Sequence, residues 1–202
     1  MTPKELFDYV DENKPNAFSN ATKTIWLNEV EGMVQTEVFL LSEREVFEYR
    51  WSATVSTGIS FPDEHTVGIA DKSVLKMFRP GGKVSLTATG TYSGNTLSSA
   101  VIQAVNANGL VFAETFSHTG ETEVTTSISY DGSTVELLVE PPHSKIYRVY
   151  LEAMIDFENG EYDKYANTMT MFNAFWGEFT RWFARVYAPA DRHSPPRDRV
   201  EV

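Results

Sequence analysis

The 202-residue sequence predicts an α+β fold: a small helical connector module of about four helices, built from both chain ends, and an inserted antiparallel β-sandwich of jelly-roll or Ig-like kind. Near both ends, apolar residues recur at steps of three and four, which is typical of amphipathic helices. The middle is rich in Thr, Ser, Val and Gly, with short alternating apolar runs between turn signals, which favours strands. The predicted domains are 1–51 with 134–187 for the helical module, 52–140 for the β domain, and 188–202 for a flexible tail.

Two helices are predicted before the β domain. The first covers "KELFDYVDE", with Pro3 in its first turn. "NKPN" ends it, and Ser19 is a good N-cap for a second helix that runs to about Leu41. One face of the second helix is apolar and the opposite face is predicted to be polar. The apolar face contains Trp26, Leu27, Val30, Met33, Val34 and Val38, and the polar face Lys23, Asn28, Glu31 and Gln35.

Strands are predicted from alternating apolar runs separated by Gly, Asn and Asp. The runs are "KVSLTATGTY", "AVIQAV", "LVFAETF", "EVTTSISY" and "STVELLV". "YDGS" lies between the last two runs, and Asp-Gly tolerates the positive φ angles of a tight turn. The sequence therefore predicts a β-hairpin centred on Asp131-Gly132.

Two further helices follow the β domain. "PPHSKIYRVYLEAMIDFENG" predicts a helix from Pro141 that ends at an Asn159-Gly160 cap. Glu161 begins the last helix immediately afterwards, which predicts an αα-hairpin. The tail 188–202 combines prolines with balanced charge and has no apolar pattern, so it is predicted to be disordered in the free protein.

The last helix carries an apolar arc wider than one neighbouring helix covers. One stripe at helical spacing contains Tyr162, Tyr165, Met169, Phe172, Trp176, Phe179, Phe183 and Tyr187, and an adjoining face contains Met171, Phe175 and Trp182. Either the helix is wedged between two elements of its own core, or its second face meets another subunit. The residues predicted for packing and assembly are Trp26, Phe172, Phe175, Trp176, Phe179, Trp182, Phe183 and Tyr187, with Trp26 as partner across the helical core.

Composition narrows the possible partners. The net charge is −11 and the pI about 4.8, so the basic footprint of a nucleic-acid-binding protein is missing. The chain has no cysteine, which excludes disulfides and thiolate sites. The N-terminus lacks signal and transit patterns, and no apolar run approaches the roughly 18 residues of a membrane span. We expect a soluble protein that is made in a cytoplasm.

No catalytic set is predicted. Glu152 and Asp156 lie four residues apart on a helix, a spacing that places two carboxylates on one face, as in a catalytic acid pair. They are nevertheless interpreted as part of a solvated helix face. Asp63–His65 is interpreted as a turn, since three adjacent residues do not make a metal site. No nucleophile with a base and an oxyanion hole is recognisable, nor a phosphate-binding loop. The expectation is a protein without enzymatic activity, cofactor or metal.

Several stretches resemble one family. They are Lys14–Ser19 ("KPNAFS"), Trp26–Leu40, Pro141–Met169 and Phe172–Tyr187. In this order they resemble the small head–tail connector, or adaptor, proteins of tailed phages and prophages. The resemblance covers most of the helical module and none of the β domain. The β domain is thus expected to be an insertion, with Glu45–Trp51 and Thr134–Val139 as strands of its stem.

The resemblance implies a structural role in the virion. Such proteins form a ring, commonly a dodecamer, under the portal protein and bridge it to the tail-side connector or tail protein. DNA passes through the ring without specific binding, which suits an acidic chain. The alternative is a monomeric surface- or carbohydrate-binding module carried by the β-sandwich. Its candidate contact residues would be Tyr92, Phe112, Phe116 and Tyr130.

Overall fold

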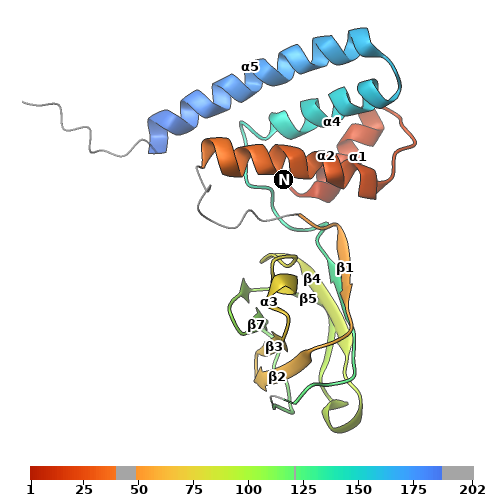
Figure 1. The fold of residues 1–202 in the computed structure, drawn as a ribbon, viewed down its shortest axis with the longest axis vertical. Helices are drawn as coiled ribbons and strands as arrows, with labels where there is room; N and C mark the ends of the chain where they lie inside the picture. The colour runs from red at the N-terminus through yellow and green to blue at the C-terminus, as the bar shows by residue number, and fades with distance from the viewer. Residues whose placement is uncertain (40–48, 121, 188–202) are drawn as a thin grey trace, which may run out of the picture.

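A computed structural model describes residues 1–39, 49–120 and 122–187. The helices from both chain ends lie together in one part of the molecule, and the strands form a second part (Figure 1). The helical part contains α1 (Pro3–Asn13), α2 (Asn20–Met33), the π-helical turn η1 (Val34–Val38), α4 (Lys145–Glu158) and α5 (Tyr162–Tyr187). The predicted α+β class is therefore confirmed. The predicted end of the second helix near Leu41 and the predicted flexible tail 188–202 lie outside the described residues.

Both N-terminal helices begin at a capping side chain, of which Ser19 was predicted from the sequence. Thr2 and Glu5 form a capping box, in which the Thr2 hydroxyl accepts the Glu5 N–H at 3.3 Å and the Glu5 carboxylate accepts the Thr2 N–H at 2.8 Å. Pro3 occupies the first turn, where no N–H is needed. The Ser19 hydroxyl accepts the Thr22 N–H at 3.1 Å and caps α2 as predicted.

Helices α4 and α5 form the predicted αα-hairpin (Figure 1). Gly160 follows the C-cap Asn159 with a φ of 74°, a conformation that suits glycine, and α5 begins two residues later. The predicted start of α4 at Pro141 is wrong, because the helix begins at Lys145. Residues 141–144 form turns instead, and a residue that precedes a proline, as Pro141 does, avoids helical geometry.

The β part consists of two four-stranded antiparallel sheets. One has the order β1-β8-β4-β5, with bounds Ser52–Val55, Ile128–Asp131, Lys83–Thr87 and Thr96–Val101. The other has the order β2-β3-β7-β6, with bounds Ile59–Asp63, Thr66–Ile69, Gly109–Val111 and Ala104–Val105. A short helix, α3 (Lys72–Leu75), and a 3-10 turn, η2 (Gly90–Tyr92), connect strands. Side chains from both sheets share one apolar cluster, separate from that of the helices; they include Ile59, Phe61, Val67, Val84, Leu86, Leu110 and Ile128.

The hairpin predicted at Asp131-Gly132 is wrong. Strand β8 ends at Asp131, pairs with β1 and β4, and is not followed by a strand. The predicted stem strand Thr134–Val139 is wrong as well, although Val135, Leu137 and Val139 are buried in alternation, as in a strand. Its backbone N–H groups bond to Met1, to a carboxylate and to a phenol instead of a neighbouring strand.

The second predicted stem strand, Glu45–Trp51, falls partly outside the described residues. Its described part, residues 49–51, precedes β1 and is not a strand. Tyr49 is fully buried, and its hydroxyl donates to the Gly132 carbonyl at 2.7 Å, so the two connections between the parts are joined by a side chain. Among the described residues, no helix combines the length and the apolar character needed to cross a bilayer.

Candidate functional site

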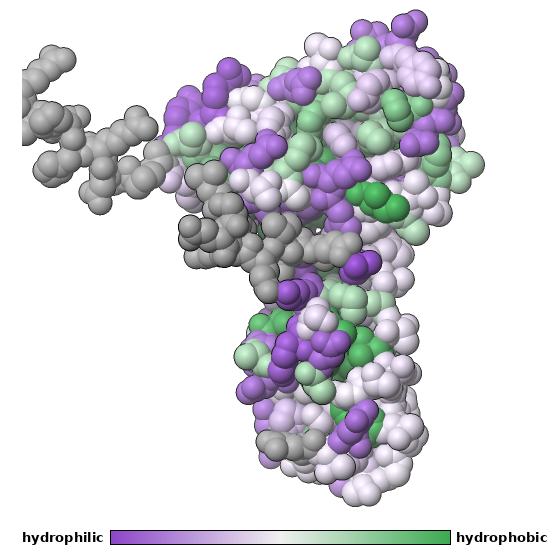
Figure 2. Space-filling model, viewed as in Figure 1, coloured by the Kyte–Doolittle hydropathy of each residue, from purple (hydrophilic) through white to green (hydrophobic). Residues whose placement is uncertain are grey.

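Several aromatic side chains of α5 pack against the helical core and remain partly exposed. The helix packs along α4 and touches η1, and it lies at the outer edge of the helical part (Figure 1). Of the aromatic residues predicted for assembly, only Phe172 and Phe179 on α5 are buried. Phe175, Trp176, Trp182 and Phe183 are partly exposed, and Tyr187 is 61% exposed. Figure 2 shows hydrophobic residues reaching the surface of the helical part among hydrophilic ones.

The rings on α5 hold one another in place. Each contacts the next along the helix, with centroid distances of 5.8 Å between Phe172 and Trp176 and 5.9 Å between Trp176 and Phe179. Phe183 and Tyr187 are 4.5 Å apart at the C-terminal end. Because such ring pairs prefer defined geometries, the surface is ordered before any partner arrives.

A groove lies at the C-terminal end of α5. It has a volume of about 370 Å³, and polar and apolar groups line it in similar measure; the lining residues are Phe39, Leu138, Val139, Glu140, Pro141, Phe179, Trp182, Phe183 and Tyr187. The ring of His143 lies behind it, 4.8 Å from that of Trp182 and 5.7 Å from that of Phe179. The segment that leads from the β part into α4 and the C-terminal end of α5 thus form this groove together.

Trp26 lies apart from this surface. It is buried in the helical core, and its ring contacts Phe18 edge-on at 5.2 Å. Trp26 belongs to the same apolar cluster as Phe172 and Phe179, so it supports the core on which α5 rests.

The interpretation of Asp156 as part of a solvated face is wrong. Its side chain is 1% exposed and forms an ion pair with Lys14, which reaches it from the end of α1. The Lys14 amine also donates to the Glu152 carbonyl at 2.8 Å. The ion pair therefore joins α1 to α4, and Asp156 has a structural role rather than that of a catalytic carboxylate. The predicted turn at Asp63–His65 is present, with the His65 N–H donating to Asp63 at 2.9 Å.

The polar face predicted for α2 is also mostly inside the molecule. Lys23, Glu31 and Gln35 are buried, whereas a polar helix face usually meets water. Lys23 donates to both carboxylate oxygens of Asp11, at 2.8 and 2.6 Å. The buried polar residues Lys23 and Glu31 thus contact side chains of neighbouring elements instead of water.

Glu31 is the centre of a buried polar network between the two parts of the molecule. One oxygen of its carboxylate accepts the Tyr147 hydroxyl at 2.8 Å and the Leu138 N–H at 3.1 Å. The other faces Arg79 of the β part at 3.7 Å. Burial raises the pKa of Glu31, and the Arg79 guanidinium counteracts part of that rise. The Tyr147 hydroxyl in turn accepts the Val139 N–H at 3.0 Å.

Sequence reasoning missed this network. Its members are scattered over α2, the α3–β4 connection and α4, and none belongs to a recognisable motif. The one available signal was Glu31 itself, a carboxylate within a segment otherwise rich in apolar residues. A buried carboxylate must find donors and a counter-charge, which only the folded chain supplies.

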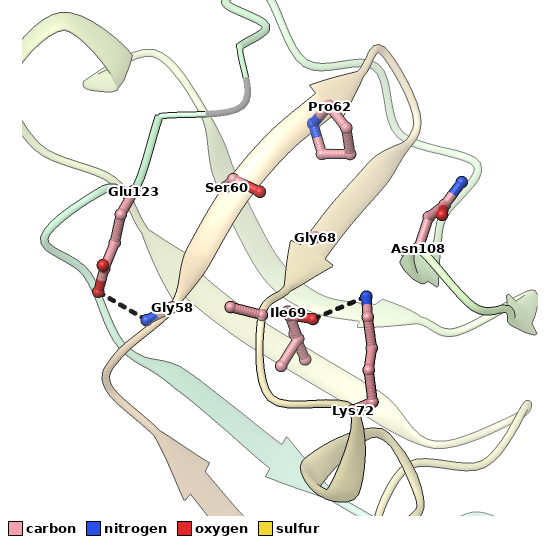
Figure 3. Close-up of a pocket in the computed structure, with 9 residues that line it drawn as sticks. Gly58, Ser60, Pro62, Gly68, Ile69, Lys72, Asn108 and Glu123 are labelled. Atoms are coloured by element: carbon pink, nitrogen blue, oxygen red, sulfur yellow. Dashed lines mark hydrogen bonds between the residues drawn. The ribbon is translucent and has the colours of Figure 1, made fainter.

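A shallow pocket of about 320 Å³ lies on the second sheet of the β part (Figure 3). Its polar groups are already engaged, because Lys72 donates to the Ile69 carbonyl at 3.2 Å and Glu123 accepts the Gly58 N–H at 2.7 Å. Gly68 forms part of its wall for packing reasons, since an added Cβ would lie 2.4 Å from the Ser60 hydroxyl. Small-molecule sites usually offer aromatic or apolar walls, and none of the described lining residues is aromatic.

The aromatic residues considered for a binding face on the sandwich lie mostly in its core. Phe112, Phe116 and Tyr130 are buried, and Tyr92 is partly exposed with its ring stacked on Phe61 at 5.8 Å. Among the described residues, no group of three or more His, Asp and Glu side chains is placed to hold a metal ion. Comparisons of this chain with protein-family models, curated proteins and solved structures find no match.

Proposed function

We propose that this chain is a structural virion subunit whose copies form a ring between the portal of a phage head and the tail, without enzymatic activity. The observation that carries the proposal is the ordered aromatic surface of α5, which its own chain leaves partly exposed. Exposed apolar surfaces of this kind mark protein interfaces. Ring closure needs two different contact surfaces on each subunit, and the groove at the C-terminal end of α5 is a candidate for one of them.

The sequence resemblance to head–tail connector proteins supports the same role. The proposed binding partners follow from this resemblance. They are further copies of the chain, twelve in the virion, the portal protein, and a tail-side connector or tail protein. The net charge of −11 suits a ring through which DNA moves, because basic groups in the lumen would bind phosphates.

The β part is proposed to be an inserted sandwich of the broad jelly-roll or Ig-like kind. Two antiparallel sheets with a shared apolar cluster support this assignment. The chain enters the β part at β1 and leaves it after β8, and Ser52 and Asp131 are direct partners across these two strands. Such neighbouring ends are what an insertion into a helical protein requires. Its proposed role is to add contact area beside the ring.

The first test is the native mass of the protein over a concentration series, with and without its portal protein. A closed high-order ring, formed alone or only with the portal, is the expected result. A strict monomer that ignores the portal would overturn the proposal.

Trp182 offers a test at the level of one side chain. Because Trp182 is only partly buried, Trp182→Ala is expected to weaken assembly by about 2 kcal/mol per contact while lowering the melting temperature little. The matched control is Phe179→Ala, which removes a buried ring and should destabilise the monomer by roughly 3 to 5 kcal/mol. Normal rings with a collapsed melting temperature in the Trp182 variant would place this residue in the internal core instead.

A further inference from the structure

A short loop of the β part contacts the other side of the junction between the two parts. It comprises residues 79–82 ("RPGG"), between α3 and β4, and is called here the junction loop. The Arg79 guanidinium lies 3.7 Å from the Glu31 carboxylate on α2. The Gly81 carbonyl accepts the Thr134 hydroxyl at 3.1 Å, and Thr134 lies on the segment that returns to the helices. The loop therefore contacts both the helical part and one of the connections.

The backbone of the junction loop is anchored within the β part. Gly81 has a φ of 86°, a left-handed conformation that glycine adopts without strain, and its N–H donates to the Ile102 carbonyl at 2.9 Å. At Gly82 an added Cβ would lie 2.5 Å from the Tyr130 ring, so the missing side chain lets the loop lie close to β8. The position of Arg79 is thus coupled to that of the whole β part.

The two parts of the molecule have separate cores. The buried apolar cluster of the helices and that of the sandwich share no residue, and among the described elements no helix of the helical part packs along a strand. The chain crosses between the parts beside Ser52 and again beside Asp131, and these two residues are paired partners (Figure 1). Rotation about this junction leaves both clusters intact, so it requires less free energy than a motion that opens a core.

The Glu31–Arg79 pair is suited to hold one orientation without making it permanent. Glu31 is fully buried and Arg79 is 8% exposed, so both charges have lost most of their water. Their separation of 3.7 Å is longer than a hydrogen bond, and the Glu31 oxygen that faces Arg79 has no hydrogen-bond partner among the described residues. Attraction in a buried pair offsets the loss of water only when the geometry is good, so these two charges separate more readily than a well-bonded pair.

We propose that the Glu31–Arg79 pair is a latch: the β part pivots about its two connections, and the pair selects the orientation observed. Loss of either charge releases the β part while both cores stay folded. The inference is independent of the proposed ring, because every contact that it uses lies within one copy of the chain.

Spin labels on introduced cysteines measure the orientation directly, because the chain has no cysteine of its own. Asn167→Cys on α5 and Ser98→Cys on β5, both at exposed positions, place one label on each part. Double electron–electron resonance on labelled protein diluted in unlabelled protein reports the distance within one copy. With the latch intact, one narrow distance distribution is expected. Arg79→Met in the same labelled chain is expected to at least double its width.

Two further variants separate release of the latch from damage to the fold. Arg79→Met leaves Glu31 buried without its counter-charge, which destabilises the helices. The double variant Glu31→Gln/Arg79→Met removes both charges, and it is expected to keep the broad distribution together with the helical circular dichroism of the wild type. Lys72→Met is the control, because it removes a cation whose amine donates within the β part, to the Ile69 carbonyl at 3.2 Å. Its distribution should stay narrow.

Each other outcome overturns the latch. A narrow distribution in the double variant would show that the orientation does not depend on the pair. A broad distribution with the latch intact, or one that Lys72→Met broadens equally, would show that the pair does not select the orientation. Loss of helical structure in the double variant would show that the pair holds the fold itself. None of these results depends on whether the chain assembles with its portal protein.

Discussion

At the scale of single residues, the buried charges explain how the two parts of the molecule are held in one orientation. Glu31 is fully buried, and its partners come from both the helical part and the β part. A buried ion pair is a weak source of net stability, because desolvation opposes the attraction. Removing one partner is nevertheless costly, so the network penalises any other arrangement of the two parts.

The Glu31 carboxyl predicts a specific pH dependence. Its pKa is raised in the folded protein, chiefly by burial, so the folded state holds this proton more tightly than the unfolded state does. The stabilising contribution is complete below the usual pKa of a glutamate and is lost as pH rises through the raised value. We therefore expect the free energy of unfolding of the wild type, relative to Glu31→Gln, to fall across that window. Denaturant titrations of both proteins at a series of pH values measure the difference, and a constant difference would contradict the prediction.

Lys14 provides a prediction about the second buried carboxylate. Lys14→Met leaves Asp156 buried without its cation, so the free energy of unfolding should drop by roughly 3 kcal/mol. Lys4→Met is the control, because the Lys4–Asp8 pair is exposed, with both side chains 60% accessible. Removing such an exposed pair should change stability far less, because water and salt screen it. Chemical denaturation distinguishes the two, and equal losses would show that the Lys14 pair is unimportant.

At the scale of elements, replacing two glycines of the α4–α5 hairpin is expected to change stability in opposite directions. Gly160 has a φ of 74°, whereas Gly177 lies inside α5, where an added Cβ would meet only the Arg181 guanidinium, at 4.0 Å. Gly160→Ala should destabilise the protein by about 1 kcal/mol, because a Cβ disfavours left-handed geometry. Gly177→Ala should stabilise it by up to about 1 kcal/mol, because glycine weakens a helix interior. Thermal melts of both variants test the pair, and shifts of the same sign would contradict it.

The segment from Gly132 to Val139 shows why an element can be mistaken for a strand. Its side chains alternate between buried and exposed positions, which is the pattern of a half-buried strand. Strand identity, however, depends on where the backbone hydrogen bonds go. Here the N–H groups of Leu138 and Val139 are taken by Glu31 and Tyr147, so the segment contains turns and bends and belongs to no sheet.

At the scale of the whole molecule, two separate apolar clusters are joined through a narrow connection. No member of the buried helical cluster lies between residues 50 and 134. Ser52 and Asp131 are paired partners, so the two connections to the β part run side by side. The β part is thus a candidate for removal, provided that its contact with Glu31 is compensated.

We expect that replacing residues 53–130 by Asn-Gly leaves the helical part folded only if Glu31→Gln is introduced as well. A two-residue turn joins adjacent antiparallel strands, which is the geometry of Ser52 and Asp131. The deletion also removes Arg79 and leaves Glu31 buried with its charge unpaired. Far-UV circular dichroism and thermal melts compare the two deletion variants. Loss of helical structure in both would show that the helical core depends on the β part.

The sequence by itself determined the elements with local causes. The capping box at Thr2, the Ser19 cap and the glycine after α4 act within a few residues, so their signals are readable from the chain alone. The α+β class followed for the same reason, because hydrophobic periodicity is a property of neighbouring residues.

The tertiary structure alone decided which polar residues are buried and which rings remain exposed. Glu31 meets Arg79 across 48 positions of the sequence, and Asp156 meets Lys14 across 142. Periodicity placed both carboxylates toward water, because it carries no information about a distant cation. It likewise gave α5 a wide apolar arc without showing which side α4 covers. Burial depends on elements that only folding brings together, and this is why the partly exposed rings of α5 and the groove emerged from the structure.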